Sequence, residues 1–439
     1  MSSMKSVLLQ AGKLAVPTHA DERSLLATSE LLKQKAHSAV SRFPEVVDFV
    51  FGGSFAKGTW LPQQHDLDIF VRIDAGTPES RFEEVGLAVG NAMTRGYPRG
   101  KKYAQHPYTE ALVEEVKVNV VPCYAVKARM WKSAADRSPF HVELVKALPA
   151  SRKREIRLLK LFMRGIGVYG AEIEVKGFSG YAAEVLVIRQ GGFLQVLKHF
   201  SASVPPKDGA FTLPDPVDEG RDLARAISGE KLGRLVLASR EFLKAPNLRY
   251  FTDLRGRHRA SLASSVTAVV FKHKPLVEDI LWGELRKTGK HLVRHLETRA
   301  FRIARWMCAS DNLSSSAFLL IPEFTVLPRM EQRVGPTVDR ADDVKSFLSS
   351  NSKTSLLVWV DDDARVRLIK AREFMKLTTL LGALAAGRVE PIGASDDIAA
   401  ALRKGARILN GPALSSEMKR SRWLARGVTE IVSDALGTS

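Results

Sequence analysis

Cysteine is scarce in this sequence, and its scarcity excludes two kinds of fold. The two cysteines in 439 residues, Cys123 and Cys308, stand far apart and form no paired spacing. A disulfide framework and a cysteine-based structural zinc site are therefore excluded, and a reducing compartment is expected.

Long apolar runs are also missing. No stretch of about 18 apolar residues occurs, and residues 1–25 lack a basic segment followed by an apolar one. We therefore expect a cytoplasmic protein that is neither exported nor inserted into a membrane.

Acidic residues are outnumbered by basic ones. The sequence has 66 Lys and Arg against 48 Asp and Glu, a formal net charge of +18. Such a charge attracts polyanions and makes nucleic acid the leading partner, although the same excess can serve solubility alone. Hydrophobic residues at 45% and charged residues at 26% exclude a disordered or fibrous chain. At this length we expect two to four domains.

The first 150 residues alternate between helix and strand signals. Apolar residues recur at helical spacing over 21–40 and over Phe82–Arg95. Val46–Phe51 predicts a short buried strand, and Glu110–Val121 predicts an alternating strand that Pro122 ends. We therefore expect an α/β domain over residues 1–150.

Beyond residue 150 the pattern becomes mainly helical and then mixed. Residues 155–170 and 180–200 predict helices of a second domain, 151–255. A third domain is predicted over residues 256–439, and it begins with a long basic helix over Val277–Met307. A strand is predicted over Phe318–Leu327, a hairpin of strands over Ser355–Ile369, and helix from Asp396 to Leu436. The predicted fold class is multidomain α/β and α+β.

Two carboxylates open an otherwise apolar strand. Residues two apart on a strand face the same side, so Asp66 and Asp68 point together while Leu67, Ile69 and Val71 enter the core. Two like charges held close cost energy unless a cation lies between them, so the pair indicates a divalent metal. Mg²⁺ prefers carboxylate and phosphate oxygens, and two such ions about 4 Å apart activate an attacking hydroxyl and neutralise a leaving pyrophosphate.

A small polar turn, Gly52-Gly53-Ser54, precedes these carboxylates. A glycine turn lets backbone N–H groups and a serine hydroxyl approach phosphate oxygens, and Lys57 adds positive charge. Either signal alone is more often a plain turn or a solvated strand end. Their order and spacing together indicate a site for a nucleoside triphosphate and its metal ions.

The segment from Gly52 to Phe70, GGSFAKGTWLPQQHDLDIF, resembles the signature of the polymerase-β-type nucleotidyltransferases, and its Gly-Thr-Trp-Leu stretch resembles the archaeal class I CCA-adding enzymes. Further segments that carry this resemblance over nearly the whole chain are Tyr103–Tyr108, Val120–Tyr124, Lys132–His141, Arg157–Lys160, Tyr169–Glu172, Gly177–Tyr181, Asp215–Asp218 and Arg333–Phe347. The resemblance implies a nucleotidyltransferase palm, a helical neck that completes the nucleotide pocket, and body and tail domains that bind tRNA.

The resemblance also implies roles for single residues. Asp66 and Asp68 match catalytic metal ligands, and Arg221 matches an arginine that reads the Watson–Crick edge of the incoming base. The positions implied to bind the nucleotide are Gly53, Ser54, Lys57, His106, Ser138, Lys160, Tyr169 and Arg221. The implied metal is Mg²⁺.

The chain departs from the family at a third carboxylate position, where Asn119 stands. Strand alternation places Asn119 opposite Val118 and Val120, so we expect it to point at the metals and to act as a catalytic metal ligand. An amide oxygen can bind Mg²⁺, but it brings no charge and takes no proton. We therefore expect nucleotide binding to persist while the chemical step slows.

Two explanations of Asn119 stay open, an introduced replacement and natural divergence. Lys57, where many relatives have Arg, and Asp222, where Asn is usual after the base-reading arginine, favour divergence. Because a carboxylate cannot donate to a base carbonyl, Asp222 also puts nucleotide selection in question.

A second set of candidates is basic. The helix expected over Val277–Met307 carries many Lys and Arg, with Phe301 and Trp306 interleaved. The residues predicted to contact RNA are Arg294, Arg299, Arg302 and Arg305. The two aromatics can stack on RNA or belong to the hydrophobic core, and the core is the preferred interpretation.

The sequence therefore predicts a CCA tRNA nucleotidyltransferase. It would add C, C and A to the tRNA 3′ end from CTP and ATP without a nucleic-acid template and would bind the acceptor and TψC stem. The resemblance implies a homodimer. Two alternatives remain: a catalytically impaired or inactive tRNA-binding homologue, which Asn119 permits, and a nucleotidyltransferase with another RNA acceptor.

Overall fold

The computed structural model describes residues 3–62, 66–202, 211–252, 260–389 and 393–433. The chain divides into two compact units, Met1–Arg255 and Gly256–Asp434, called here the N-terminal unit and the C-terminal unit. Among the described residues, none of the helices combines the length and apolar character that crossing a lipid bilayer requires.

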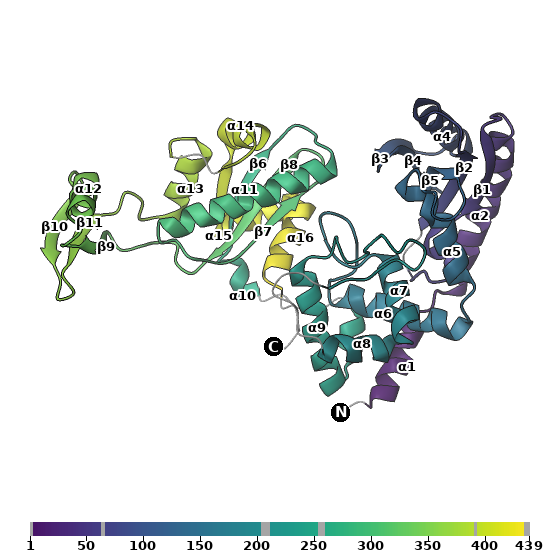
Figure 1. Cartoon of the computed structure of the whole chain (residues 1–439), viewed down its shortest axis with the longest axis horizontal. Coiled ribbons are helices and arrows are strands. Elements are labelled where there is room, and N and C mark those ends of the chain that lie inside the picture. The colour runs from purple at the N-terminus through teal and green to yellow at the C-terminus, as the bar shows by residue number, and fades with distance from the viewer. Residues whose placement is uncertain (1–2, 63–65, 203–210, 253–259, 390–392, 434–439) are drawn as a thin grey trace. The chain divides into compact units, whose positions relative to one another are not determined.

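The N-terminal unit contains a five-stranded sheet and a group of helices (Figure 1). Its strands are β1 Val46–Phe51, β2 Asp66–Asp74, β3 Arg99–Tyr103, β4 Pro107–Val113 and β5 Val116–Ala125. Its helices are α1 Met4–Leu14, α2 His19–Val40, α3 Gly53–Lys57, α4 Glu79–Met93, η1 Ala134–Arg137, α5 Ser138–Lys146, α6 Ala150–Gly165, α7 Gly180–Gln190, α8 Phe193–Ala202, α9 Gly229–Lys244 and η2 Leu248–Phe251.

The five strands run in the order β1-β2-β5-β4-β3, with β2 and β5 parallel and the other neighbours antiparallel. Helices α2 and α4 pack together on one face of this sheet, where Leu67, Ile69, Val118 and Phe82 are fully buried. Strand alternation turns the side chains between these residues to the other face. The predicted helix over 21–40 and the predicted strand Val46–Phe51 are both confirmed.

The single strand predicted over Glu110–Val121 is wrong. The chain turns back at Glu114 and Glu115, whose φ angles are 47° and 62°, so β4 and β5 form a hairpin. Two positive φ values are typical of a type I′ turn, which usually needs Gly or Asn, so no residue at this position signals a turn. Pro122 does not end the strand either. The last residue pair between β4 and β5 is Thr109 with Val120, so Pro122 lies beyond it and its missing N–H removes no hydrogen bond to β4.

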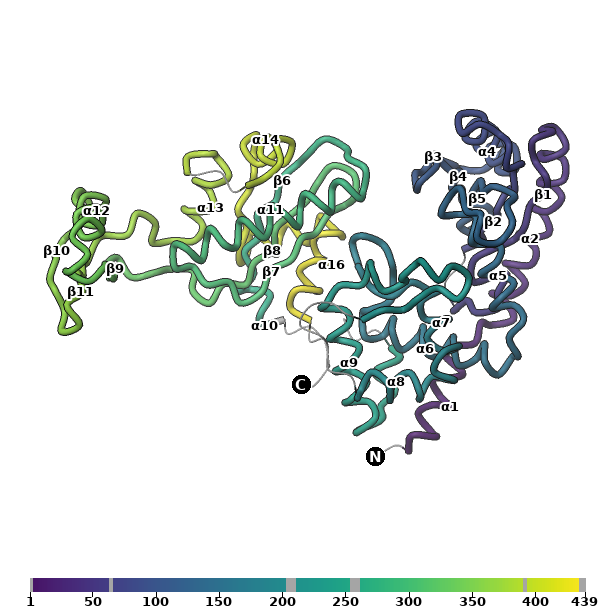
Figure 2. Tube along the Cα trace, viewed as in Figure 1, coloured from purple at the N-terminus to yellow at the C-terminus, as the bar shows by residue number. Residues whose placement is uncertain are grey.

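The helices α6 to α9 surround a second core of the N-terminal unit. Phe162, Phe193 and Phe242 are fully buried in it, and Val7 and Ala11 of α1 join the same cluster. Figure 2 shows α1 beside α6, although the two are far apart in the sequence. The helices predicted over 180–200 are confirmed as α7 and α8, whereas α6 ends at Gly165, five residues before the predicted end.

The C-terminal unit contains two further sheets, ordered β12-β6-β8-β7 and β10-β11-β9. Its strands are β6 Thr267–Lys272, β7 Ile303–Ser310, β8 Ser315–Pro322, β9 Met330–Thr337, β10 Ser355–Val360, β11 Arg365–Ala371 and β12 Arg407–Asn410. Its helices are α10 Ala260–Ala263, α11 Glu278–Thr298, α12 Ala341–Asn351, α13 Leu377–Ala385, α14 Asp396–Gly405, α15 Gly411–Arg420 and α16 Arg422–Ile431. The hairpin predicted over Ser355–Ile369 is confirmed as β10 and β11.

The long helix predicted over Val277–Met307 is wrong beyond Thr298. Ala300 takes a φ of 68°, the N–H of Phe301 donates to the carbonyl of Leu296, and the chain then enters β7. This is a Schellman C-cap, in which glycine usually holds the left-handed position. Because alanine stands where glycine is usual, no residue marks the end of the helix, and the helical spacing of apolar residues continues past it.

Candidate active site

The two aspartates of β2 and Asn119 of β5 lie on one face of the five-stranded sheet. In the parallel register of these strands Asp68 stands opposite Asn119, and Asp66 stands opposite Lys117. Lys117 makes its ion pair with Glu110 at 2.8 Å rather than with Asp66. The expected geometry, with Asn119 on the aspartate face, is therefore confirmed.

Asp68 and Asn119 are joined by a hydrogen bond. The amide Nδ2 of Asn119 donates to Oδ1 of Asp68 at 2.9 Å. Burial raises the pKa of Asp68, an effect that the Asn119 hydrogen bond opposes and the charge of Asp66 reinforces. The other amide atom, Oδ1 of Asn119, is buried and has no hydrogen-bond partner among the described residues. A buried acceptor left in this state is costly unless something binds to it.

Gly53 lets the backbone approach this carboxylate closely. A Cβ at Gly53 would lie 2.0 Å from Oδ2 of Asp68, and its φ of +60° also disfavours other residues. Gly53 begins the short helix α3 rather than forming the plain turn that the sequence suggested. Ser54 follows it as the second residue of α3.

The donor set at this point fits a hard divalent cation. Two carboxylates, from Asp66 and Asp68, and the unpartnered amide oxygen of Asn119 are all oxygen ligands, which Mg²⁺ prefers. The set carries two negative charges instead of three, because Asn119 is neutral.

Lys57 and Lys160 converge on a carboxylate that the sequence reasoning missed, Glu184 of α7. Lys57 Nζ lies 2.9 Å from Glu184 Oε2, and Lys160 Nζ lies 2.7 Å from Oε1. The hydroxyl of Thr59 donates to Oε1 at 2.6 Å and accepts from Lys160 at 3.0 Å. Although burial alone raises the pKa of Glu184, the ammonium groups of Lys160 and Lys57 lower it to about 2.

Glu184 could have been singled out from the sequence. It stands in the helix GYAAEVLVIRQ, where Ala182, Ala183, Val185, Leu186 and Val187 are buried around it. A carboxylate in an apolar stretch of this kind requires a cationic partner.

Tyr169 lies near this group, whereas Ser138 is placed only by its helix. A Cβ added at Gly180, the first residue of α7, would lie 2.9 Å from the Tyr169 hydroxyl and 3.6 Å from Lys160 Nζ. Burial and the charge of Glu184 raise the pKa of Tyr169 above its ordinary value, so the hydroxyl stays protonated. Ser138 is the first residue of α5, which packs against α3.

Arg221 belongs to a cluster around Asp215. The carboxylate of Asp215 accepts from Arg221 Nη1 at 3.2 Å and from the Tyr181 hydroxyl at 2.8 Å, and it lies 3.0 Å from His141 Nε2. Burial opposes ionisation of Asp215, but hydrogen bonds from His141, from the backbone N–H of Val217 and from the Tyr181 hydroxyl hold its pKa below the ordinary range. Lys57 Nζ stands 4.8 Å from the centre of the Tyr181 ring, so this cluster adjoins that of Glu184.

Asp222 has a backbone role. Its Oδ1 accepts from the N–H groups of Leu213 and Ala224 at 2.7 and 2.9 Å. The carboxylate thus organises the turn that carries Arg221.

His106 does not join these groups. Its Nδ1 lies 3.0 Å from Oε1 of Glu83 and 3.6 Å from Oε1 of Glu79, and its ring packs on Phe82. All three partners belong to α4, which covers the face of the sheet opposite Asn119. The contacts of His106 therefore do not support its predicted place beside the nucleotide.

The four arginines predicted to contact RNA have different surroundings. Arg294 is exposed on α11, and Arg302 is exposed with a 3.9 Å ion pair to Glu323. Arg299 is the residue after α11 and its side chain contacts His295, whereas Arg305, on β7, donates to the carbonyls of Ile431 and Ser433. Phe301 is fully buried, which confirms the preferred core interpretation, and Trp306 packs over Gly289.

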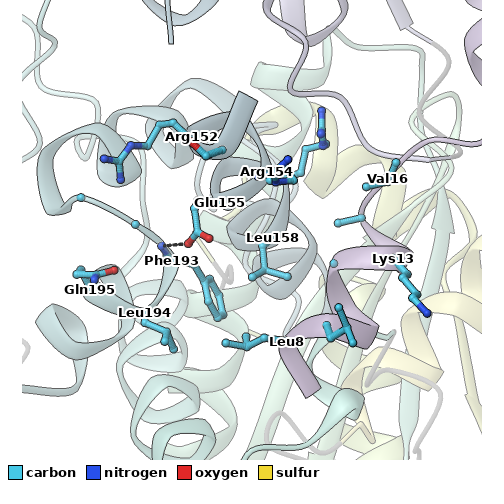
Figure 3. A pocket seen from close by; sticks show the side chains of 17 residues that line it. Leu8, Lys13, Val16, Arg152, Arg154, Glu155, Leu158, Phe193, Leu194 and Gln195 are labelled. Carbon is cyan, nitrogen blue, oxygen red and sulfur yellow. Dashed lines mark hydrogen bonds between the residues drawn. The ribbon is translucent and has the colours of Figure 1, made fainter. Parts of the chain in front are cut away.

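A separate basic hollow lies between α1, the start of α6 and the turn from α7 to α8 (Figure 3). It measures about 750 Å³, and Lys13, Arg152 and Arg154 stand around apolar residues such as Leu158. Glu155 in this hollow accepts a 2.9 Å hydrogen bond from the backbone N–H of Phe193.

Family models match successive parts of the chain. The nucleotidyltransferase domain matches residues 32–141, the second domain of tRNA nucleotidyltransferases matches 154–252, and the C-terminal domain of CCA-adding enzymes matches 263–411. The first match coincides with the sheet that carries Asp66, Asp68 and Asn119. The protein is therefore a nucleotidyltransferase of mixed α/β and α+β fold.

Curated relatives define the family more closely. The CCA-adding enzyme of Pyrobaculum islandicum is 35% identical over 87% of this chain and 93% of the relative. That of Pyrobaculum neutrophilum is 37% identical over 77% and 83%, and that of Archaeoglobus fulgidus is 31% identical over 79% and 82%. The chain belongs to the family of CCA-adding enzymes.

Proposed function

We propose that this chain adds C, C and A to the 3′ end of tRNA from CTP and ATP, without a nucleic-acid template. The observation that carries the proposal is the cluster of Asp66, Asp68 and Asn119 beside Gly53, in a chain that matches CCA-adding enzymes over most of its length. In each addition the tRNA 3′-oxygen bonds to the α-phosphorus of the nucleotide as the bond to pyrophosphate breaks.

Asp66, Asp68 and Asn119 would hold Mg²⁺. When bound there, the metal lowers the pKa of the attacking hydroxyl and neutralises charge on the leaving pyrophosphate. Gly53 lets the backbone of α3 approach Asp68, so a triphosphate bound at α3 would lie beside the metal ligands.

In this proposal Asn119 limits the rate of the chemical step. Its Nδ2 already donates to Asp68, so a carboxylate at the same position would face Asp68 as a like charge. Before metal binds, the amide therefore stabilises the protein. In exchange, the metal ion has one negatively charged ligand fewer. We expect normal nucleotide binding and a slow chemical step, whatever the origin of Asn119.

The nucleotide would lie along α3, α5 and α7. Lys57, Lys160 and Tyr169 share the Glu184 region, Ser54 lies in the first turn of α3, and Ser138 begins α5. Such a set of donors suits triphosphate oxygens. Arg221, held by Asp215, would read the base edge through its fixed donors.

The C-terminal unit would bind the acceptor and TψC stem of tRNA by shape and phosphate contacts. Lys287, Lys290 and Arg294 are exposed and share one face of α11 by their spacing of three and four residues. Arg302 is the other exposed candidate. The contacts of Arg299 and Arg305 within the protein make them weaker candidates than the sequence suggested.

The remaining predictions are carried into this proposal. The three-domain division at residues 150 and 255, a cytoplasmic location and a homodimer are all part of it. Exposed apolar side chains on the edge strand β10, Leu356, Val358 and Val360 among them, support self-association.

Product length tests the proposal. Incubated with Mg²⁺, CTP, ATP and tRNA lacking its CCA end, the chain should add three nucleotides and stop. Continued extension would instead favour a nucleotidyltransferase with another acceptor. Binding of tRNA with no extension, even in the Asn119→Asp variant, would identify a tRNA-binding homologue without activity, an alternative that the enzyme relatives do not favour.

A further inference from the structure

The two lysines proposed to bind triphosphate are not displayed to solvent. The side chains of Lys57 and Lys160 are 8% and 1% exposed, and that of Glu184 between them is 1% exposed. Three ionised groups in so little contact with water are costly unless each is closely paired. One carboxylate serves two ammonium groups here, so the trio keeps one positive charge in excess.

The trio connects three separate segments of the chain. Lys57 ends α3, Lys160 lies in the middle of α6, and Glu184 lies one turn into α7. Thr59 tightens the connection, because its hydroxyl donates to Glu184 and its carbonyl accepts from Lys160 at 3.3 Å. Any change at Glu184 therefore alters the positions of both lysines together.

The trio also adjoins the carboxylates of the active site. Gly53, which touches Asp68, and Lys57 are the first and last residues of the same short helix, α3. The charge of Lys57 acts on Asp68, and the charge of Asp66 acts on Tyr169. The excess positive charge therefore lies near the proposed place of the triphosphate.

We propose that Glu184 is a positioning residue for nucleotide binding: it holds the ammonium groups of Lys57 and Lys160 in place so that the excess positive charge meets the triphosphate. This inference rests on the proposed function. Glu184 itself does not touch the nucleotide; it acts through the two lysines. Its role differs from that of a purely structural ion pair, because its loss changes the placement of groups that bind the substrate.

The test is the affinity for CTP as a function of pH in the full-length chain, measured by calorimetry with Mg²⁺ present. In Glu184→Gln the two ammonium groups lose their counter-charge in a buried setting, so their pKa values fall. We expect about tenfold weaker CTP binding at neutral pH and an alkaline loss of binding that begins about one pH unit or more below that of the wild type.

Two further variants separate positioning from folding. Glu184→Asp keeps the charge but reaches only one lysine, so it should bind CTP more weakly at every pH and lose binding at the wild-type alkaline pH. If Glu184→Gln does not fold, Glu184→Asp alone still tests the proposal. Glu155→Gln is the matched control, because Glu155 is bonded to a backbone N–H in the same unit and contacts no ammonium group among the described residues. It should leave CTP binding unchanged.

Unchanged CTP affinity and an unchanged alkaline limb in Glu184→Gln would overturn the role of Glu184, as would wild-type affinity in Glu184→Asp. A wild-type chain that binds CTP normally but adds nothing to tRNA would contradict the proposed function instead. Because binding is read without turnover, the two failures remain distinct.

Discussion

The two units of this chain treat charge in opposite ways. In the N-terminal unit Lys57, Asp136, Lys160, Glu184 and Asp215 are all buried. Among the described residues of the C-terminal unit, the buried polar side chains are hydroxyls and His273, with no carboxylate or ammonium group.

This difference separates two uses of charge. Buried charges interact strongly and in fixed geometry, as chemistry on a triphosphate requires. Exposed charges such as Lys290 and Arg294 act weakly and over a range of distances, as contact with a long polyanion requires. The comparison predicts large, site-specific effects of substitution in one unit and small, salt-dependent effects in the other.

The largest expected effect is at Asp68. Asp68→Asn should reduce nucleotide incorporation about a thousandfold, because it removes a charged metal ligand. Thermal stability should stay equal or rise, since burial makes the charge of Asp68 costly.

Asp311→Asn in the C-terminal unit is the control. The carboxylate of Asp311 accepts from the N–H groups of Leu313, Ser314 and Ser315, so its substitution should lower the melting temperature and leave kcat intact. If Asp68→Asn lost less than about tenfold in activity, the assignment of the metal site would be wrong.

A second prediction concerns stability. Lys160→Met should reduce the free energy of unfolding by about 1–3 kcal/mol, because it removes a hydrogen-bonded ammonium partner of Glu184 in a dry setting and leaves only Lys57 and Thr59. Lys290→Met on α11 should change it by less than about 0.5 kcal/mol. Denaturant unfolding measures both, and equal losses would contradict the contrast between the units.

The third prediction is a pH dependence of stability. The pKa of Glu184, about 2 in the folded protein, lies below its ordinary value of 4.5. Its contribution is therefore complete above pH 4.5 and is lost as the pH falls toward about 2, in total on the order of 3 kcal/mol. The unfolding free energies of wild type and Glu184→Gln should converge over this acid range, and parallel curves would argue against the buried pairing.

The smallest expected effect concerns the exposed cations of α11. Replacement of Lys287, Lys290 and Arg294 by Ala should weaken tRNA binding about tenfold and lower the salt slope by up to about three. The value of kcat at saturating tRNA should not change. A salt slope equal to that of the wild type would show that tRNA binds elsewhere.

The strand that carries Asp66 and Asp68 was predictable because strand alternation and local chemistry agree there. Leu67, Ile69 and Val71 are buried as expected, and Asn119 faces Asp68. The roles of these residues stay predictions. Their shared location followed from the parallel neighbours β2 and β5, whose pairing no local pattern revealed.

The missed features arise where the backbone adopts a special conformation without a special residue. Glu114, Glu115 and Ala300 have positive φ angles, which Gly or Asn usually adopt. The sequence pattern therefore predicted neither the hairpin at Glu114 and Glu115 nor the helix end before Ala300. His106 shows another limit of prediction from sequence. A motif match identifies a residue, but it does not say which face of the sheet the side chain of that residue contacts. Glu184 was overlooked although its apolar surroundings called for a partner.

The most direct measurement is single-turnover incorporation of CMP into tRNA lacking its CCA end, by the wild type and by Asn119→Asp. If Asp66, Asp68 and residue 119 hold the catalytic metal, the added carboxylate should raise the rate about tenfold or more in Mg²⁺ while CTP affinity stays the same. It should also lower stability in the absence of Mg²⁺, because two carboxylates then face each other. An unchanged rate in the variant, with metal and CTP bound, would place the catalytic centre elsewhere.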